Sequence, residues 1–290
     1  MAADVSSASG LSVLTLVKNR PTHLHRMVEG LARSTVPPCE LVVVDMSDHP
    51  VVLPDTPFPS RSIRLRTGGL PLAEARNLAA DRSRGERMLF LDVDCIPAAD
   101  LVDRMDTALA ANDALICAEV RYLGAGAVRD GWTEADLMTR GQVHPVRDFP
   151  ASGLKQEQNA GLFWSLAFGI RRTAFDALGG FDPRFAGYGA EDTDFGFRAR
   201  DAGLPLLFMG KTGAFHQHHG VFDPPLQHFE DVLRNAETFR RKWGDWPMTG
   251  WLAAFEAMGL IRLEREDLCR LRRPTASEIA GARKPETAPF

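Results

Sequence analysis

The sequence has no run approaching the ~20 consecutive apolar residues that a membrane-spanning helix needs. Its opening residues, MAADVSSASG, lack both the basic and the apolar segment of a secretory signal peptide. Lysine and arginine number 34 against 38 aspartates and glutamates, so the net charge is -4 and no basic excess indicates nucleic-acid binding. These absences predict a cytoplasmic protein with no nucleic-acid partner and no stable membrane insertion.

Cysteine is scarce, and no two cysteines have the CxxC spacing of a zinc ribbon. We therefore expect small hydrophobic side chains in a reducing compartment, not a disulfide framework, at Cys39, Cys95, Cys117 and Cys269. Internal repeats are also absent. With 290 residues, 44% hydrophobic and 25% charged, the chain is long enough to bury a large core.

Short apolar runs alternate with helical patterns in the first 120 residues. We expect strands over 11–17, 40–44, 62–66, 87–91 and 114–120, and helices over 22–33, 72–82 and 98–111. This alternation predicts an α/β fold with a mainly parallel central sheet flanked by helices, in which ligands gather at the carboxyl ends of strands. Asp45 and the pair Asp92 and Asp94 directly follow such strands.

The second half of the chain is less regular. Residues 122–160 are rich in glycine, proline and charge, which predicts a long loop or lid, whereas residues 226–243 have the spacing of an amphipathic helix. The expected organisation is a domain over 1–225 with halves 11–121 and 122–225, a helical extension over 226–273, and a flexible tail over 274–290.

Residues 261–273 combine an apolar stripe with five arginines and three acids. A basic amphipathic helix of this kind can lie on a membrane, but the net charge of only about +2 is below that of lipid-binding clusters. We therefore expect a surface helix that does not bind vesicles.

Asp92-Val93-Asp94 places two carboxylates at the end of an apolar strand. A DxD sequence alone is common at turns and helix caps. At a strand end, however, two adjacent anionic groups are costly unless a hard divalent cation and a diphosphate share the site. The position therefore favours a metal and nucleotide site.

The segment Gly187-Tyr188-Gly189-Ala190-Glu191-Asp192 places an aromatic residue between two glycines and before two acids. Acids in the first turn of a helix can simply complement its dipole. The glycines permit a tight turn beside a ligand, so the whole segment favours a substrate platform followed by a general base. Further on, His216, His218 and His219 lie within four residues, which raises the prospect of a metal ligand.

These segments resemble the metal-dependent inverting glycosyltransferases of the GT-A fold, especially family-2 enzymes and the beta-1,4-galactosyltransferase and chondroitin-polymerase groups. The GWGGED motif of the latter corresponds to residues 187–192, and an FxDVDxIP pattern to residues 90–97. An early nucleotide segment corresponds to residues 17–24, and a segment ending near the metal histidine to residues 214–217. The four segments occur in the family order and span residues 11–219.

The resemblance implies a GT-A fold with a C-terminal helical extension, in a bacterial enzyme. The implied activity is transfer of a sugar, with inversion, from a UDP-hexose or UDP-N-acetylhexosamine to an acceptor hydroxyl. A divalent metal, Mn²⁺ more than Mg²⁺, would stabilise the departing diphosphate. The acceptor would be a carbohydrate, a glycolipid or a small molecule.

The resemblance also implies roles for individual residues. Asp94 and His216 would hold the metal, with Asp92 near the ribose and the metal's waters. Asp45 would accept from the uracil, and Arg20 and Arg76 would contact the nucleotide or its phosphates. Asp192 would be the base, Glu191 would hydrogen-bond the sugar, and Tyr188 with Gly189 would form the sugar platform.

Several positions depart from the family pattern. Tyr188 replaces the usual tryptophan, Ala190 replaces a glycine, and Gly213 stands where the galactosyltransferases have a metal-binding methionine. We expect His218 and His219 to be a solvated pair.

Two other functions share features with this sequence. A sugar nucleotidyltransferase needs a glycine-rich phosphate loop after the first strand, and residues 17–21 contain no glycine. A non-catalytic nucleotide-sugar-binding module is also compatible with the fold, but it would be expected to have lost Asp94 or Asp192, and both are present.

Overall fold

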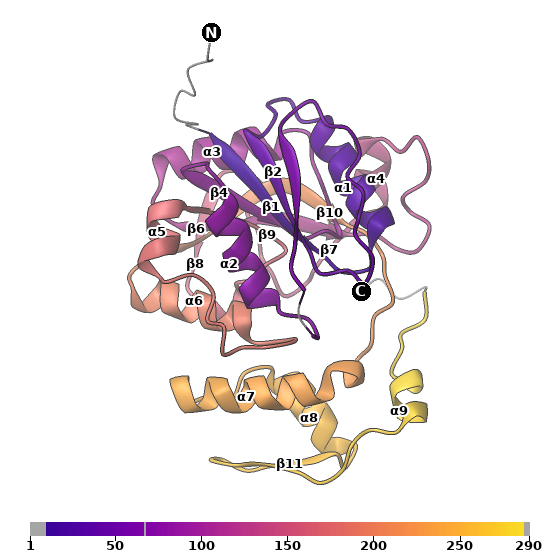
Figure 1. Cartoon of the computed structure of the whole chain (residues 1–290). Coiled ribbons are helices and arrows are strands. Elements are labelled where there is room, and N and C mark those ends of the chain that lie inside the picture. Colours follow the sequence, from indigo (N-terminus) through magenta and orange to yellow (C-terminus); the bar gives the residue numbers. More distant parts are fainter. Residues whose placement is uncertain (1–9, 67, 287–290) are drawn as a thin grey trace.

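The computed structural model describes residues 10–66 and 68–286, with a ten-stranded sheet at the centre (Figure 1). Its strands are β1 (Leu11–Val17), β2 (Glu40–Asp45), β3 (Ser60–Arg64), β4 (Arg87–Leu91), β5 (Cys95–Pro97), β6 (Leu115–Tyr122), β7 (Gln142–Val143), β8 (Leu154–Glu157), β9 (Ala167–Arg171) and β10 (Leu206–His216). The continuous apolar runs of β2 and β4 fit strands that are covered on both faces.

The strand order is β3-β2-β1-β4-β9-β6-β10-β5, with β7 beside β6 and β8 beside β10. From β3 to β4 neighbouring strands are parallel, and β10 is parallel to β6. Strand β9 is antiparallel to both β4 and β6, and β5 is antiparallel to β10. The sheet is thus mostly parallel, as the sequence predicts, with antiparallel strands on one side.

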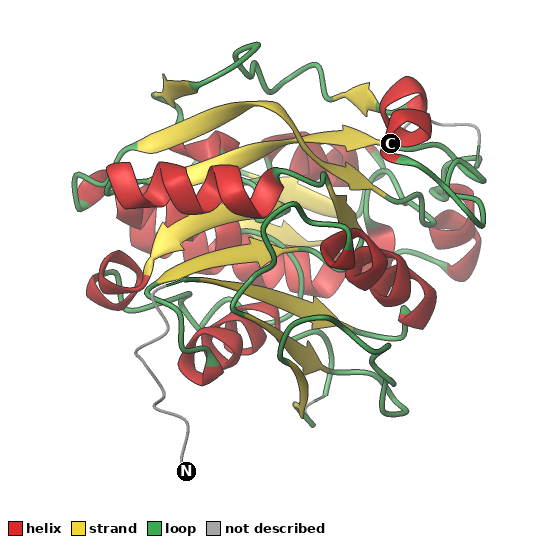
Figure 2. Cartoon of the chain, turned by 90° about the horizontal axis from the view of Figure 1, so that it is seen from above, coloured by secondary structure: helices red, strands yellow, loops and turns green. Residues whose placement is uncertain are grey.

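Helices cover both faces of the sheet (Figure 2). They are α1 (Pro21–Ala32), α2 (Leu72–Arg82), α3 (Leu101–Ala111), α4 (Glu134–Arg140), α5 (Arg172–Ala177) and α6 (Glu191–Asp201), with a 3-10 turn, η1 (Ala160–Leu162). The buried stripes of α1 and α3 share one core cluster, and those of α2, α5 and α6 share another. This is the three-layer α/β/α architecture that the alternating pattern predicts.

The second of these clusters contains a group of phenylalanines. Phe168 stacks on Phe90 with ring centroids 4.7 Å apart, and it contacts Phe163, Phe181 and Phe195 at 4.9–6.4 Å. Phe181 and Phe195 stack on each other at 4.4 Å. The rings therefore join β4 and β9 to the segment that leads into α6.

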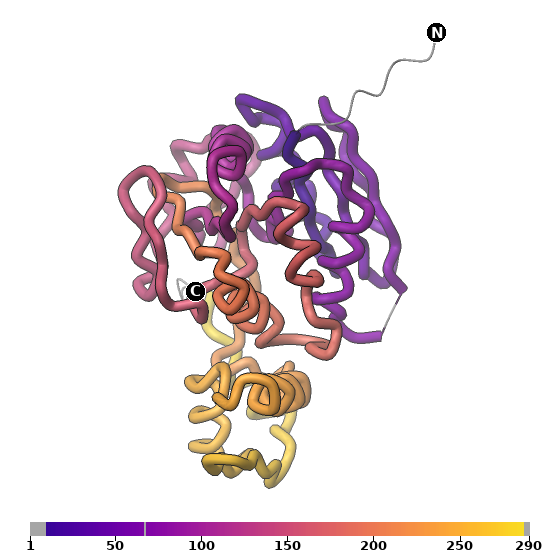
Figure 3. The backbone as a smooth tube through the Cα atoms, turned by 90° about the vertical axis from the view of Figure 1, so that its left-hand side faces the viewer, coloured from indigo at the N-terminus to yellow at the C-terminus, as the bar shows by residue number. Residues whose placement is uncertain are grey.

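The chain after β10 forms a layer below the sheet, visible at the bottom of Figures 1 and 3. It contains η2 (Leu226–His228), α7 (Phe229–Trp243), α8 (Thr249–Ala257), β11 (Ile261–Leu263), β12 (Leu268–Arg270) and α9 (Ala276–Gly281). The predicted amphipathic helix is α7, and its buried face shares a separate core cluster with α8 and β11.

Two expectations for irregular or helical segments are wrong. Residues 122–160 are not one long loop, because they hold β7, β8 and α4, whose capping box joins Thr133 and Asp136. Residues 261–273 form a β11–β12 hairpin instead of a helix. The few apolar residues of so short a segment fit both the helical period of 3.6 and the strand period of 2. In the structure, Ile261 and Leu263 pack against the C-terminal core and the intervening Arg262 is exposed.

All five arginines of this hairpin segment pair with glutamates. The pairs are Arg262–Glu264, Arg265–Glu266, Arg270–Glu230, Arg272–Glu278 and Arg273–Glu230. Among the described residues, no helix is both long and apolar enough to cross a membrane.

The segment expected to be a flexible tail begins with structure. Helix α9 has a capping box between Thr275 and Glu278, and the chain then returns to the sheet domain, where Lys284 N donates to Val221 O at 2.8 Å. Residues 287–290 of that tail, and the opening residues 1–9, lie outside the described residues.

Replacing Phe168 by alanine should lower the free energy of unfolding by about 3–5 kcal/mol, because it removes a ring from the centre of the phenylalanine group. Chemical denaturation followed by circular dichroism measures this change. Val52→Ala, at a side chain that is 76% exposed, is the control and should change stability by less than about 0.5 kcal/mol. Equal effects of both variants would contradict the assigned core.

Candidate active site

A cavity of about 1480 Å³ opens at the carboxyl ends of the parallel strands and extends to the C-terminal layer. Strands β1, β4 and β10 deliver to it Arg20, the pair Asp92 and Asp94, and the histidines after Phe215. The loop before α6 supplies Tyr188 and Gly189, and the first turn of α6 supplies Glu191 and Asp192. The topology thus brings together residues that are far apart in the sequence, at the sheet edge where α/β proteins bind ligands.

Three side chains in the cavity form a candidate metal centre. Possible ligand atoms of Asp94, His216 and His219 all lie within 4.8 Å of one another. The antiparallel pairing of β5 with β10 brings them together, because His216 lies opposite Cys95 and Gln217 N donates to Asp94 O at 2.6 Å. One carboxylate and two imidazoles suit a divalent transition metal.

Asp94 is the centre of this group. Its side chain is almost fully buried, and among the described residues its Oδ1 atom has no hydrogen-bond partner. Its Oδ2 atom is paired with the Arg20 guanidinium and lies 3.6 Å from His219 Nε2. A buried acceptor without a donor is costly, so the Asp94 carboxylate is suited to bind a cation.

The histidines of the group are held neutral. Burial lowers the pKa of His216 well below its ordinary value, and burial followed by the nearby Arg20 lowers the pKa of His219 to about 4. Neutral imidazole is the form that coordinates a metal. The expectation that His218 and His219 form a solvated pair is therefore wrong for His219, which is half-buried against Asp94. The backbone carbonyl of His218 lies 3.2 Å from His23 Nε2.

Asp92 lies in the same cavity and is half-buried. Burial raises its pKa, an effect that Arg20 and Arg76 partly offset. The positive charges of Arg20 and Arg76 near this carboxylate can also attract an anionic ligand in the cavity.

Asp45 is at the predicted strand end but does not line the cavity. It is fully buried and accepts from Ser47 N at 2.8 Å, Val51 N at 2.9 Å and Arg64 Nη1 at 2.6 Å. Burial opposes its ionisation, but these donors outweigh it and lower the pKa of Asp45. The side chain holds the 46–51 loop in place, a role that the resemblance does not imply.

Arg76 lines the cavity but is engaged by the protein. Its guanidinium donates to Glu191 Oε1 at 3.0 Å and to Ser165 Oγ at 2.7 Å, and it lies over the Phe181 ring. This arrangement orients Glu191. The expected contact with a phosphate would have to share the same guanidinium.

Glu191 and Asp192 begin α6 at the cavity wall. Glu191 is buried and paired with Arg76, whereas among the described residues Asp192 has no ion-pair partner and accepts a hydrogen bond from Thr193 N at 2.7 Å. Burial, and then the neighbouring Glu191 carboxylate, raise the pKa of Asp192 to about 6. A carboxylate with this pKa is suited to accept a proton near neutral pH.

The turn before these acids is held from α7. The buried Asn235 side chain donates to Tyr188 O at 3.2 Å and to Gly189 O at 2.9 Å. Gly187 has φ +80°, and a Cβ there would meet the Asp231 carboxylate at 2.3 Å, so only glycine fits. Tyr188, the expected sugar platform, lines the cavity, and its ring stacks on His228 with centroids 4.4 Å apart.

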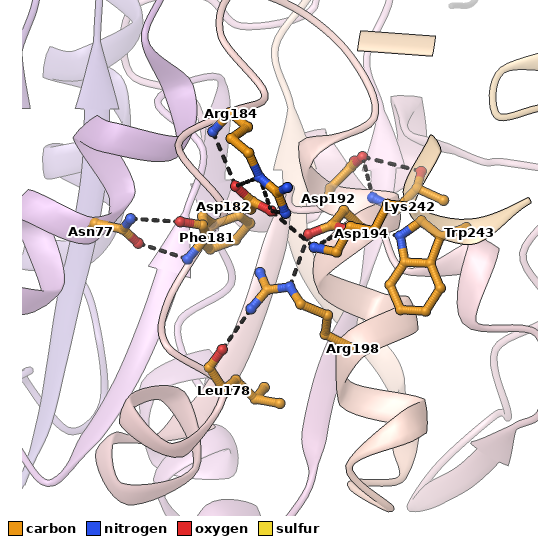
Figure 4. Close-up of polar contacts among 11 residues, drawn as sticks. Asn77, Leu178, Phe181, Asp182, Arg184, Asp192, Asp194, Arg198, Lys242 and Trp243 are labelled. Carbon is orange, nitrogen blue, oxygen red and sulfur yellow. Dashed lines mark hydrogen bonds and ion pairs between the residues drawn. The ribbon is translucent and has the colours of Figure 1, made fainter. Parts of the chain in front are cut away.

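Asp182 and Asp194 do not line the cavity, and their polar contacts, drawn in Figure 4, hold α6 against the rest of the protein. Asp194 is fully buried and accepts from Arg198 Nε and Trp243 Nε1, both at 2.9 Å, and from Lys242 Nζ at 2.7 Å. Lys242 also pairs with Asp182 at 2.9 Å. Asn77 of α2 donates to Phe181 O and accepts from Phe181 N, both at 2.7 Å.

The sequence profile of the "Glycosyltransferase like family 2" family matches residues 66–239, which is more than half of the chain. The chain belongs to this glycosyltransferase family. The match includes the Asp92–Asp94 pair, the Glu191–Asp192 pair and His216. No curated protein matches the chain in sequence.

Solved glycosyltransferase structures have the same fold as this family-2 chain. S. aureus TarS 1-349 is 15% identical with a TM-score of 0.52, over 79% of this chain and 65% of that one. Its complex with UDP is 16% identical, with the same TM-score and coverage. GalNAc-T7 with UDP, GalNAc and Mn²⁺ is 18% identical with a TM-score of 0.52, over 72% of this chain and 43% of that one. The chain thus spans less than two thirds of these proteins, and the likeness shows a GT-A type fold.

Sequence reasoning missed several residues of this site. His219 follows His216 by three positions, and that spacing after a strand end is a signal that could have identified it. Ser165 and Asn235 carry no motif, because their roles depend on contacts with Arg76 and with the 188–189 carbonyls. His23 Nε2 lies 3.9 Å from Asp94 Oδ1. This histidine is within the early nucleotide segment, but the resemblance implies no role for it.

Replacing Asp194 by asparagine should lower the free energy of unfolding by about 3 kcal/mol, because Arg198 and Lys242 would lose a buried anionic partner. Urea denaturation measures the change. Asp201→Asn, an exposed acid at the end of the same helix, should cost less than about 0.5 kcal/mol. If Asp194→Asn is as stable as Asp201→Asn, the Asp194 network is not what anchors α6.

Proposed function

We propose that this protein is an inverting glycosyltransferase that moves a sugar from a UDP-sugar to an acceptor hydroxyl with a divalent metal. The observation that carries the proposal is that the Asp94–His216–His219 group and the Glu191–Asp192 pair open on one cavity. The first suits a metal-bound diphosphate, and the second suits a sugar and the activation of its acceptor. The UDP complex of TarS and the UDP, GalNAc and Mn²⁺ complex of GalNAc-T7 support this assignment.

The residues present fit a divalent cation. Asp94 Oδ1 is buried without a partner among the described residues, and the two imidazoles beside it are neutral. Mg²⁺ prefers oxygen ligands in a strict octahedron, whereas a set with two imidazoles favours a transition ion. Of the two ions that the resemblance implies, Mn²⁺ is the transition ion and therefore the better candidate. When bound, such an ion supplies Lewis-acid stabilisation of the leaving diphosphate.

The cationic side chains of the cavity extend the donor site. Lys18 and Arg20 follow β1 and line the cavity beside Asp92. Arg20 is paired with Asp94. Its guanidinium is suited to contact phosphate oxygens when a cation neutralises that carboxylate. Asp92 lies within the field of Arg20 and is the candidate contact for the ribose.

Asp192 is the candidate base. It takes the proton of the acceptor hydroxyl, whose oxygen forms a bond to the anomeric carbon while the bond to the diphosphate breaks and its electron pair leaves with UDP. Glu191, oriented by Arg76, accepts hydrogen bonds from the sugar. Attack from the face opposite the leaving group gives inversion.

The metal assignment predicts that Asp94→Asn and His216→Ala abolish Mn²⁺-dependent binding of UDP, and that His219→Ala weakens it about tenfold or more. Calorimetric titration of UDP with Mn²⁺ and with a chelator measures this dependence. His49→Ala, at an exposed histidine outside the cavity, is the control and should bind as the wild type does. Wild-type-like metal dependence in Asp94→Asn would show that the site is misassigned.

The base assignment predicts that Asp192→Asn lowers hydrolysis of the UDP-sugar by about 10² or more without changing UDP affinity. In the wild type the rate should rise with pH through about 6, because the base works ionised. Folding raises this carboxyl pKa from 3.8 to about 6, so the ionised side chain destabilises the protein at pH 7. This cost shrinks as the pH falls below about 6 and is gone below 3.8, where the unfolded chain is also protonated.

Asp192→Asn should therefore be at least as stable as the wild type at pH 7, and its rate should lack the acidic limb. Thermal melts and pH–rate profiles of the two proteins test both statements. A variant that keeps near-normal hydrolysis and the same pH profile would move the base to Glu191.

A further inference from the structure

The cavity is larger than one ligand needs. At about 1480 Å³ it exceeds the ~300–1,000 Å³ of pockets that hold a single small molecule. Its strand-end half has the metal group and the cationic side chains. Its other half is lined by the C-terminal layer, which the proposed donor site leaves unassigned.

That other half is aromatic. Tyr188, His228, Trp246 and Trp251 line it, and we call these four residues the aromatic end. The Tyr188 ring stacks on His228 at 4.4 Å and lies 5.9 Å from Trp251, tilted by 26°. Trp246 is held by a hydrogen bond from its Nε1 to Arg265 O at 3.3 Å and lies beside Arg240. All four side chains are half-buried, so their rings remain partly accessible from the cavity.

Tyr188 connects the aromatic end to the reacting acids. Burial raises its pKa to about 12, with further contributions from the Glu191, Asp192 and Asp92 carboxylates. A ring bound over the aromatic end would therefore lie next to the candidate base. This is the place that an acceptor must occupy.

The charges around the aromatic end select against an anionic ligand. Lys284 lines this part of the cavity and is paired with Asp223 at 3.2 Å, and Arg240, beside Trp246, is paired with Glu266 at 2.8 Å. Asp245 is exposed at the rim, and Asp192 lies at the inner side. An anionic ring would be repelled by these carboxylates, whereas a neutral ring would meet no such repulsion.

We infer that the aromatic end is an acceptor subsite that binds the ring of a neutral sugar; this rests on the proposed function. The C–H face of a sugar ring carries partial positive charge, which the negative faces of the aromatic rings attract. Its hydroxyl groups point outward from the ring edge, where Glu191 and Asp192 can accept from them. The C-terminal layer thus supplies the acceptor specificity.

The test measures binding of methyl and octyl β-glycosides of glucose, galactose and N-acetylglucosamine to the full chain saturated with UDP and Mn²⁺. Methyl β-glucuronide is the anionic counterpart. We expect at least one neutral methyl glycoside to bind more tightly than the glucuronide. Trp251→Ala should weaken that binding about tenfold, and Trp251→Phe should retain most of it, because a ring remains for stacking.

Controls separate the subsite from the donor site. The UDP affinity of Trp251→Ala should equal that of the wild type, and Trp132→Phe, whose indole lies under Arg33 outside the cavity, should change neither affinity. Trp246→Ala provides a second test if Trp251→Ala does not fold.

The following results would overturn the inference. They are equal methyl-glycoside binding by wild type and both alanine variants, tighter binding of the glucuronide, and binding of octyl glycosides alone, which would indicate a lipid site. A wild type that binds UDP but no neutral glycoside would overturn it as well. A wild type that fails to bind UDP would instead contradict the proposed function.

Discussion

The antiparallel pairing of β5 with β10 is the contact on which the candidate metal centre depends. It places His216 opposite Cys95, next to Asp94, and continues in the bond from Gln217 N to Asp94 O. These residues come from strands more than 100 positions apart. Because backbone pairing sets the positions of Asp94 and His216, these two candidate ligands need little reorganisation to receive a cation, which lowers the cost of binding.

The C-terminal layer has a comparable role for the acids of α6. Asn235 holds the carbonyls of Tyr188 and Gly189, and Lys242 and Trp243 hold Asp194. All three residues are on α7, which the sequence indicates only as an amphipathic helix. The loop and first turn that contain Glu191 and Asp192 are thus fixed between the sheet domain and the extension. The flexible glycines of this loop are therefore compatible with a site of defined geometry, because contacts from α7 hold the loop in place.

The features that follow from local patterns could be predicted from the sequence. Hydrophobic periodicity predicts the strands β1 and β4 and the alternation of strands with helices. The end of β4 then fixes the place of Asp92 and Asp94, which directly follow it. The β11–β12 hairpin was missed because its few apolar residues fit two periods. Asp45 lies at the end of β2, as the apolar run predicts, but the donors around Asp45 and the Glu191 partner of Arg76 arise from tertiary contacts that no spacing reveals.

The acids of the Glu191–Asp194 segment look equivalent in the sequence and become different through their partners. Asp194 is surrounded by Arg198, Lys242 and Trp243, so its charge is neutralised within the fold. Asp192, two residues earlier, points to the cavity without an ion-pair partner among the described residues, and its pKa is raised. A helix places residues two apart on different faces, so the spacing itself separates the two roles. One carboxylate stabilises the fold, and the other is left with the proton affinity that a base requires.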